Sequence, residues 1–396
     1  MSHRLHQLNR LTQPNRVTRS LDPERQEKAR EYARIRRWLL LADLGLAAAF
    51  VLVMLFSGLS SHLAARIQAV VPWRPAVVAL YTLAFFGAYG LLDLPLSFYS
   101  GFVLPHRYGL STQTLGGWLL DLVKGAVVGG IVGLTAMEVM YWLLAAFPST
   151  WWLLTGVLYL LFTIVMTNLA PLLIVPLFFK CTPLADEELT QRLVRLAERA
   201  GTRVRGVFTI NLSSKTTAAN AALMGLGNTR RIVLGDTLLE NYTADEIEVI
   251  LAHELGHHVH HDVIWGLLVQ SALTLGGLYL ASLGLRWGVR SFGFQGIADV
   301  AAFPLLAMVM GAFGVITLPL GNAYSRWRES LADEYALTMT GKPEAMITAM
   351  TKLANQNLAE VDPSPWVEFL LYSHPAIGRR IKRAREYAQG RERSTA

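Results

Sequence analysis

Six long apolar segments decide what this chain of 396 residues can fold into. A helix that crosses the hydrocarbon layer of a bilayer needs roughly 20 mostly apolar residues, because no water is present there to satisfy its backbone polar groups. The composition agrees, since 53% of the residues are hydrophobic and 16% are charged. We therefore expect a mostly α, multi-pass α-helical membrane protein with six spans, at about residues 38–58, 76–100, 120–147, 151–176, 263–287 and 300–322.

Positive charge is concentrated at the two ends of the chain. Residues 1–37 contain ten Lys or Arg and four acids, and the stretch from Arg379 to Arg393 is densely basic. Cytoplasmic segments of membrane proteins carry an excess of Lys and Arg, so both termini are predicted to face the cytoplasm. The formal net charge of +7 then reflects topology and attraction to anionic lipid. Because no nucleic-acid-binding motif accompanies it, nucleic acid is not expected as a partner.

Two polar segments interrupt the apolar pattern and flank the last two spans. Because an even number of spans separates them, they lie on one face of the membrane, where they can build a single domain. The predicted organisation is a basic cytoplasmic tail (1–37), spans one to four (38–180), a first polar segment (181–262), spans five and six (263–322) and a second polar segment (323–396).

The first polar segment mixes helical and strand patterns. The predicted elements are a helix over 187–201, a strand over 204–210 and a hairpin formed by 219–226 and 231–234. Thr243 and Glu246 then have the spacing of a capping box, which opens a helix that runs through His257. We expect a small β-sheet beside this helix.

The helix contains His253, Glu254 and His257 in an HExxH pattern. Positions four apart lie on one face of a helix, so both imidazoles can bind one zinc ion. The Glu254 carboxylate can take a proton from the metal-bound water and return it to the leaving amine. The alternative, a surface helix with incidental histidines, does not account for the capped helix next to a membrane span. Three further histidines are expected to be solvated or interfacial, namely His258, His260 and His261. Asp262 is a candidate helix cap.

A catalytic zinc site takes three protein ligands and keeps one position open. The second polar segment begins with a helical pattern that places Glu329 and Asp333 one turn apart on the same face. Glu329 can bind zinc while Asp333 orients a bound imidazole through its other ring nitrogen. Spacing alone leaves Glu248 and Glu334 as competing acids, and an ordinary charged helix is the simpler alternative. The sequence thus predicts one Zn²⁺ per chain and a membrane zinc peptidase, with the peptidase domain divided between the two polar segments.

Several short boxes accompany the zinc motif. They are Leu94–Ser100, Gln113–Gly116, Pro176–Phe178, Thr182–Leu184, Asn220–Ala221, Arg231–Leu234, Asp236–Leu238, Ser325–Arg326, Ala332–Asp333 and Tyr372–Pro375. With these boxes the chain resembles the type I CAAX prenyl protease family, which are membrane-embedded gluzincins that cut prenylated CAAX proteins. The resemblance implies a gluzincin-type zinc peptidase domain that contains a small β-sheet.

The resemblance also implies roles for residues that spacing does not single out. Asn220 and Ala221 are expected on an edge strand that pairs with the substrate backbone. His374 and Arg380 are expected near the metal, where they assist the transition state or hold a peptide carboxylate. The family usually has seven spans where six are counted here. The lack of a long insertion in the catalytic domain, together with His258 after the zinc motif, suggests a prokaryotic member in the cytoplasmic membrane.

Three functions are consistent with these observations. The first is an endopeptidase that acts on CAAX-type or other membrane-associated proteins, so the expected partners are a peptide or protein substrate, prenylated or membrane-bound, and the lipid bilayer. The second is a quality-control metallopeptidase without prenyl specificity. The third is a non-enzymatic scaffold or transporter that keeps zinc for structure and uses its intramembrane charges, which are Asp93, Asp121, Lys124 and Glu138. The sequence carries no signal for the oligomeric state.

Overall fold

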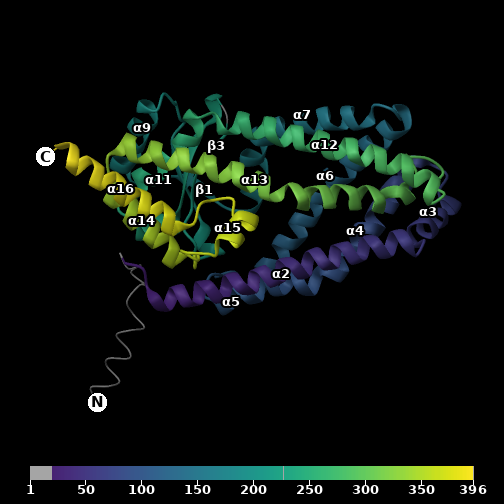
Figure 1. Cartoon of the computed structure of the whole chain (residues 1–396), viewed down its shortest axis with the longest axis horizontal. Helices are drawn as coiled ribbons and strands as arrows, with labels where there is room; N and C mark the ends of the chain where they lie inside the picture. Colours follow the sequence, from purple (N-terminus) through teal and green to yellow (C-terminus); the bar gives the residue numbers. More distant parts are fainter. Residues whose placement is uncertain (1–19, 226, 396) are drawn as a thin grey trace, which may run out of the picture.

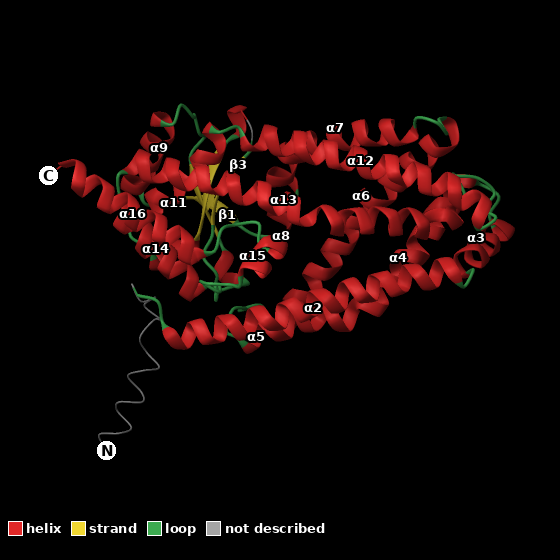
Figure 2. Cartoon of the chain, in the orientation of Figure 1, coloured by secondary structure: helices red, strands yellow, loops and turns green. Residues whose placement is uncertain are grey.

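The computed structural model describes residues 20–225 and 227–395. Long helices form one end of the molecule, and a mixed domain with a small sheet forms the other (Figures 1 and 2). The helices of the first half are α2 (Pro23–Phe56), α3 (Leu59–Val70), α4 (Arg74–Phe98), α5 (Leu104–Arg107), α6 (Leu115–Ala146), α7 (Trp151–Leu173), α8 (Val175–Phe178) and α9 (Glu187–Arg199). Those of the second half are α10 (Asp236–Asn241), α11 (Ala244–Val259), α12 (Asp262–Ser291), α13 (Phe303–Thr340), α14 (Pro343–Gln356), α15 (Pro365–Leu371) and α16 (Ile377–Thr395).

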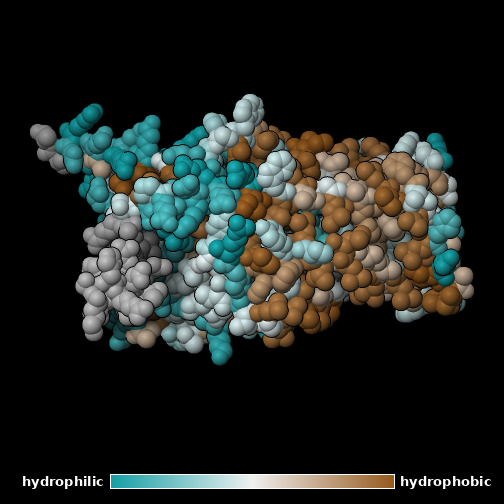
Figure 3. All heavy atoms as spheres, turned by 90° about the horizontal axis from the view of Figure 1, so that it is seen from below, coloured by the Kyte–Doolittle hydropathy of each residue, from teal (hydrophilic) through white to brown (hydrophobic). Residues whose placement is uncertain are grey.

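Six helical segments in the described chain are long and apolar enough to cross a membrane, as predicted. They are Pro23–Phe56, Arg74–Arg107, Leu115–Ala146, Trp151–Phe178, Asp262–Ser291 and Val300–Thr340. Figure 3 shows apolar side chains over the end of the molecule that these helices build, and polar side chains over the other end. Helix α3 has 12 residues and is too short to span the hydrocarbon layer. The chain is therefore a multi-pass membrane protein.

The first spanning helix differs from its expected start. The basic stretch expected as a tail is helical from Pro23, because Asp22 caps the helix by accepting a hydrogen bond from the backbone N–H of Glu24 at 2.9 Å. The helix continues into the membrane without a break. Residues 1–19, the beginning of the expected tail, lie outside the described residues.

Four strands form a mixed sheet in the order β1–β2–β4–β3. The strands are β1 (Cys181–Pro183), β2 (Val207–Ile210), β3 (Ala221–Met224) and β4 (Arg231–Gly235). β3 and β4 pair antiparallel as the predicted hairpin, while β2 and β4 are parallel. Strand β1 was not predicted, because three residues directly after a span carry no recognisable alternation. β3 lies at one edge of the sheet and packs against α11.

The two predicted polar segments share one core. Leu251 and Leu255 of α11 are buried with Leu193 of α9 and Leu234 of β4, and Ala336 of α13 belongs to the same cluster. Burial of such side chains contributes about 1.5–3 kcal/mol each, so the packing of α11 against α13 is a strong tertiary constraint. Because α13 continues from the sixth span, this core is joined rigidly to the membrane helices.

Candidate active site

The N-terminus of α11 is fixed by its cap and by an ion pair. The hydroxyl of Thr243 accepts from the N–H of Glu246 at 3.3 Å, and the Glu246 carboxylate accepts from the N–H of Thr243 at 2.7 Å. The same carboxylate oxygen receives a hydrogen bond from Lys352 of α14 at 2.7 Å. Both charged groups are buried, so the start of the helix is tied to α14.

Gly256, between the two motif histidines, allows α11 and α13 to approach closely. A Cβ atom on Gly256 would lie 2.9 Å from the Cα atom and 3.2 Å from the carbonyl oxygen of Ala332. Both are backbone atoms of α13, which cannot give way without moving that helix. The absence of a side chain at this position therefore brings the imidazoles of α11 within reach of Glu329.

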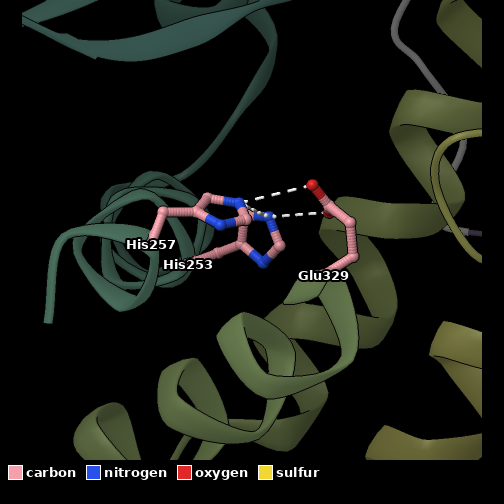
Figure 4. A group of neighbouring side chains, drawn as sticks. All are labelled: His253, His257 and Glu329. Atoms are coloured by element: carbon pink, nitrogen blue, oxygen red, sulfur yellow. Dashed lines mark hydrogen bonds and ion pairs between the residues drawn. The ribbon is translucent and has the colours of Figure 1, made fainter. Parts of the chain in front are cut away.

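His253, His257 and Glu329 converge on one point (Figure 4). Their donor atoms lie within 4.8 Å of one another, and in the described chain they are the single group of three or more His, Cys or acidic residues placed closely enough to hold a metal ion. Glu329 is 6% exposed. The two competing acids, Glu248 and Glu334, do not belong to this group. Glu248 pairs with Arg192 and Lys342, and Glu334 is exposed.

The distances between the donor atoms fit a tetrahedral ion. The Nε2 atoms of His253 and His257 are 3.2 Å apart, and Glu329 oxygens lie 3.2 Å from His253 Nε2 and 3.4 Å from His257 Nε2. Two nitrogens bound at about 2.0–2.1 Å to one tetrahedral zinc ion would be about 3.3 Å apart. Glu329 Oε2 is buried and makes no hydrogen bond within the described chain, although His253 Nε2 is 3.2 Å away. These residues fit a divalent metal.

A carboxylate holds the far ring nitrogen of each imidazole. Asp333, which is fully buried, lies 2.9 Å from Nδ1 of His253, and Asp262 lies 2.7 Å from Nδ1 of His257. Such contacts fix the tautomer and direct Nε2 toward the metal. Asp333 was expected in this position. Asp262 was expected to cap a helix, which is wrong: the N-cap of α12 is His261, and the Asp262 carboxylate contacts His257 and Arg328 instead.

Burial lowers the pKa of both imidazoles, but the surrounding carboxylates outweigh it. Asp333 and Glu329 raise the pKa of His253, while Glu329 and Asp262 raise that of His257. The cluster therefore stabilises positive charge at the point where the donor atoms meet. Burial also raises the pKa of the Glu254 carboxyl, although the neighbouring imidazoles oppose that shift. The Glu254 side chain makes no hydrogen bond in the described part of the chain.

His374 and Arg380, the two residues expected near the metal, both contact this cluster. His374 Nε2 lies 3.2 Å from Glu329 Oε1, and its side chain is 59% exposed. Arg380 is buried and donates to both oxygens of Asp333, at 2.6 and 2.9 Å, with one nitrogen 3.3 Å from His253 Nδ1. Its guanidinium is thus held behind the His253 ring. Arg380 therefore lies beside a predicted metal ligand, and its role toward the substrate stays a prediction.

Asn220 and Ala221 lie at the start of the edge strand. Asn220 is exposed and directly precedes β3, and Ala221 pairs with Leu234 of β4 on the inner side. No strand of the described chain pairs with the outer side of β3. An extended peptide could add a strand there, beside the helix that carries the histidines.

Comparisons with known proteins agree with this geometry. Residues 183–388 match the model described as Peptidase family M48, and residues 3–180 match the model described as CAAX prenyl protease N-terminal, five membrane helices. In the latter range the described chain has four spanning helices and the short α3. The metalloprotease YhfN of Bacillus subtilis is 31% identical, with 95% of this chain and 89% of that protein covered.

Two yeast proteins extend the comparison. CAAX prenyl protease 1 of Saccharomyces cerevisiae is 29% identical, with 91% of this chain and 86% of that protein covered. The crystal structure of Ste24p from S. mikatae has a TM-score of 0.80 at 25% identity, with 91% of this chain and 89% of that chain covered. These matches do not favour a scaffold, a transporter or a quality-control enzyme over the first function considered. The chain belongs to peptidase family M48 and is a multi-pass membrane metallopeptidase.

Proposed function

We propose that this protein is a zinc endopeptidase in which His253, His257 and Glu329 hold one Zn²⁺ per chain. The observation that carries the proposal is the convergence of two imidazole nitrogens and a carboxylate, 3.2–3.4 Å apart. Imidazole and carboxylate are the ligands of catalytic zinc sites in peptidases. When bound, zinc polarises the scissile carbonyl and acidifies water.

The chain's own residues then move one proton and hold the reacting groups. Glu254 takes a proton from the attacking water and delivers it to the amine that leaves when the C–N bond breaks. Burial raises the pKa of Glu254, and a higher pKa makes the carboxylate a stronger base toward the attacking water. We assign His374, whose Nε2 lies 3.2 Å from Glu329 Oε1, as the donor of a hydrogen bond to the oxygen of the scissile carbonyl as negative charge develops.

Asp333, Asp262 and Arg380 act through the histidines. The two carboxylates hold the Nδ1–H groups, so that the Nε2 lone pairs face the metal. Arg380 neutralises Asp333 and fixes its orientation with two hydrogen bonds. We assign it as a positioning residue of the ligand set. The peptidase domain then consists of the segments 181–262 and 323–396, with the membrane helices around and between them.

The proposed substrate is an extended segment of a CAAX-type or otherwise membrane-bound protein. Its backbone would pair with the outer edge of β3 at Asn220 and Ala221. The name of the S. cerevisiae relative, CAAX prenyl protease 1, supports the CAAX class. The basic ends support a catalytic domain on the cytoplasmic side, and the similarity to a Bacillus subtilis protein supports a prokaryotic cytoplasmic membrane.

The decisive test compares wild type with Glu254→Gln, both purified in detergent. The variant is expected to retain one zinc ion per chain and to lose cleavage of a farnesylated CAAX peptide by at least a factor of about 10². Retained cleavage would reject the assigned base. A matched peptide without the lipid separates the substrate classes, because equal cleavage of both argues against prenyl recognition while leaving the zinc chemistry intact.

A further inference from the structure

Asn357, at the C-terminal end of α14, clamps the backbone directly before the edge strand. Its Oδ1 accepts from the N–H of Ala219 at 2.9 Å, and its Nδ2 donates to the carbonyl of the same residue at 3.2 Å. The amide thus satisfies both backbone groups of Ala219, as a neighbouring strand would. Ala219 is 4% exposed, so water cannot replace these bonds without opening the structure.

Four consecutive carbonyls lead into β3, and each accepts a hydrogen bond from another part of the chain. Gln356 donates to the carbonyl of Thr217 at 2.8 Å, and Asn357 to that of Ala219. The other two accept from the end of β4 and the start of α10: the N–H of Gly235 donates to the carbonyl of Asn220 at 2.9 Å, and the hydroxyl of Thr237 donates to that of Ala218 at 2.8 Å. The entry to the strand is therefore fixed by α14 and by the end of β4, while no described strand pairs with the outer edge of β3.

The chain turns sharply at Leu358 to bring the Asn357 amide into place. The N–H of Ala359 donates to the carbonyl of Ala354 at 3.0 Å, which is the bond of a Schellman helix end. That motif usually has glycine in the left-handed position, but here it is Leu358, with φ at +48°. Leu358 is buried with Ala29 of α2 and with Leu110, and this packing offsets the backbone strain.

The polar N-terminal part of α2, residues 23–37, forms hydrogen bonds and an ion pair with residues on both sides of this turn. Arg25 donates to the carbonyl of Asn355 at 2.5 Å, and Arg37 pairs with Glu360 at 2.8 Å. Gln26 donates to the carbonyl of Ala359 at 3.3 Å and accepts from the N–H of Val361 at 3.2 Å. A continuous set of contacts thus runs from α2 through Asn357 to the start of β3.

We propose that Asn357 is a positioning residue for substrate: it holds the start of β3 so that a peptide added to the outer edge lies in register with the metal. The inference rests on the proposed role of β3 as the strand that pairs with substrate. Asn357 does not touch the metal ligands, so its loss weakens peptide binding and leaves the chemical step intact.

The test compares Asn357→Leu with wild type on two substrates, a peptide long enough to pair along β3 and a minimal substrate without those residues. Loss of both buried hydrogen bonds is expected to raise KM for the long peptide at least tenfold, with kcat within a factor of two. Cleavage of the minimal substrate and zinc content stay unchanged. Asn357→Asp keeps the acceptor for Ala219 N–H and is expected to show a smaller rise in KM.

Asn355→Leu is the matched control, because Asn355 lies on the same helix and its side chain bonds to the backbone of Ser20 and Asp22, just before α2, instead of to Ala219. An equal loss on long and minimal substrates, or an unchanged KM for the long peptide, would overturn the proposal. Should Asn357→Leu fail to fold, Asn357→Asp carries the same comparison. Glu254→Gln distinguishes failure of the proposed function from failure of this inference. If Glu254→Gln abolishes cleavage while both Asn357 variants bind and cut the long peptide normally, the zinc mechanism is supported and the positioning role of Asn357 is rejected.

Discussion

Gly256 controls the spacing between α11 and α13, the two helices that carry the proposed metal ligands. We predict that Gly256→Val abolishes zinc binding and cleavage and that Gly256→Ala weakens both, because a Cβ atom would meet the backbone of Ala332 and displace Glu329. A displacement of about 1 Å can reduce activity 10²-fold. Zinc content and kcat/KM are the measurements. Gly266→Ala is the control, since a Cβ there meets nothing within 4 Å; a normal zinc content in Gly256→Val would disprove the argument.

Asp262 contacts the proposed metal site through Nδ1 of His257, and its other oxygen pairs with Arg328. Replacing it with Asn keeps the shape but weakens the hydrogen bond that orients the imidazole, so zinc affinity is expected to fall about 10- to 100-fold. Competition with a chelator of known affinity measures the change. Glu334→Gln removes an exposed acid next to Asp333 and should leave the affinity as in wild type. An equal effect of the two substitutions would indicate a general loss of negative charge.

The sequence reveals the residues of the site whose relation is set within one helix. His253 and His257 follow from helical spacing, and the pairing of Glu329 with Asp333 follows from the same rule. Asp262 does not follow from that rule, because α11 ends at Val259 and the left-handed conformation of His261 redirects the chain toward His257. The position of Arg380 behind Asp333 likewise depends on how α16 packs against α13, which no local pattern specifies.

Among the elements, α11 depends on the buried pair between Glu246 and Lys352. Burial raises the pKa of Glu246, but Lys352 and the Thr243 N–H outweigh it and hold the pKa below its usual value. This stabilisation is complete above the unfolded-state pKa of about 4.3 and is lost as the pH falls through the folded-state pKa. We predict that Lys352→Met, which leaves a buried carboxylate unpaired, costs roughly 3–5 kcal/mol at pH 7.

Thermal unfolding of the detergent-solubilised protein measures this effect. The difference in melting temperature between wild type and Lys352→Met should shrink as the pH is lowered below about 4, because protonation of Glu246 removes the unpaired charge. Adding Glu246→Gln to Lys352→Met should restore part of the lost stability at pH 7. A pH-independent difference would assign the loss to the packing of Lys352 over the Tyr242 ring instead.

A helix or strand can be predicted from the sequence where its hydrophobic pattern extends over many residues. The six spans follow from hydropathy, since each must satisfy the same requirement for apolar length. The extension of α2 from Pro23 does not, because its polar side chains serve the contacts with Asn355 and Glu360 that form only in the folded molecule. Strand β1 is similar: its three residues become a strand only because β2 offers an open edge.

At the scale of the whole molecule, the mixed domain and the far loops lie at opposite ends of the long helices (Figure 1). The single cysteine makes the proposed orientation testable. In a Cys181→Ser background, a membrane-impermeant maleimide added to intact cells should label Val70→Cys, at the far end of α3, which is 81% exposed. It should label Lys382→Cys on α16, whose native side chain is 77% exposed, only after permeabilisation. The reverse pattern would place the metal site outside the cell and remove the cytoplasmic substrates proposed here; labelling of both variants after permeabilisation is the control that each thiol is accessible.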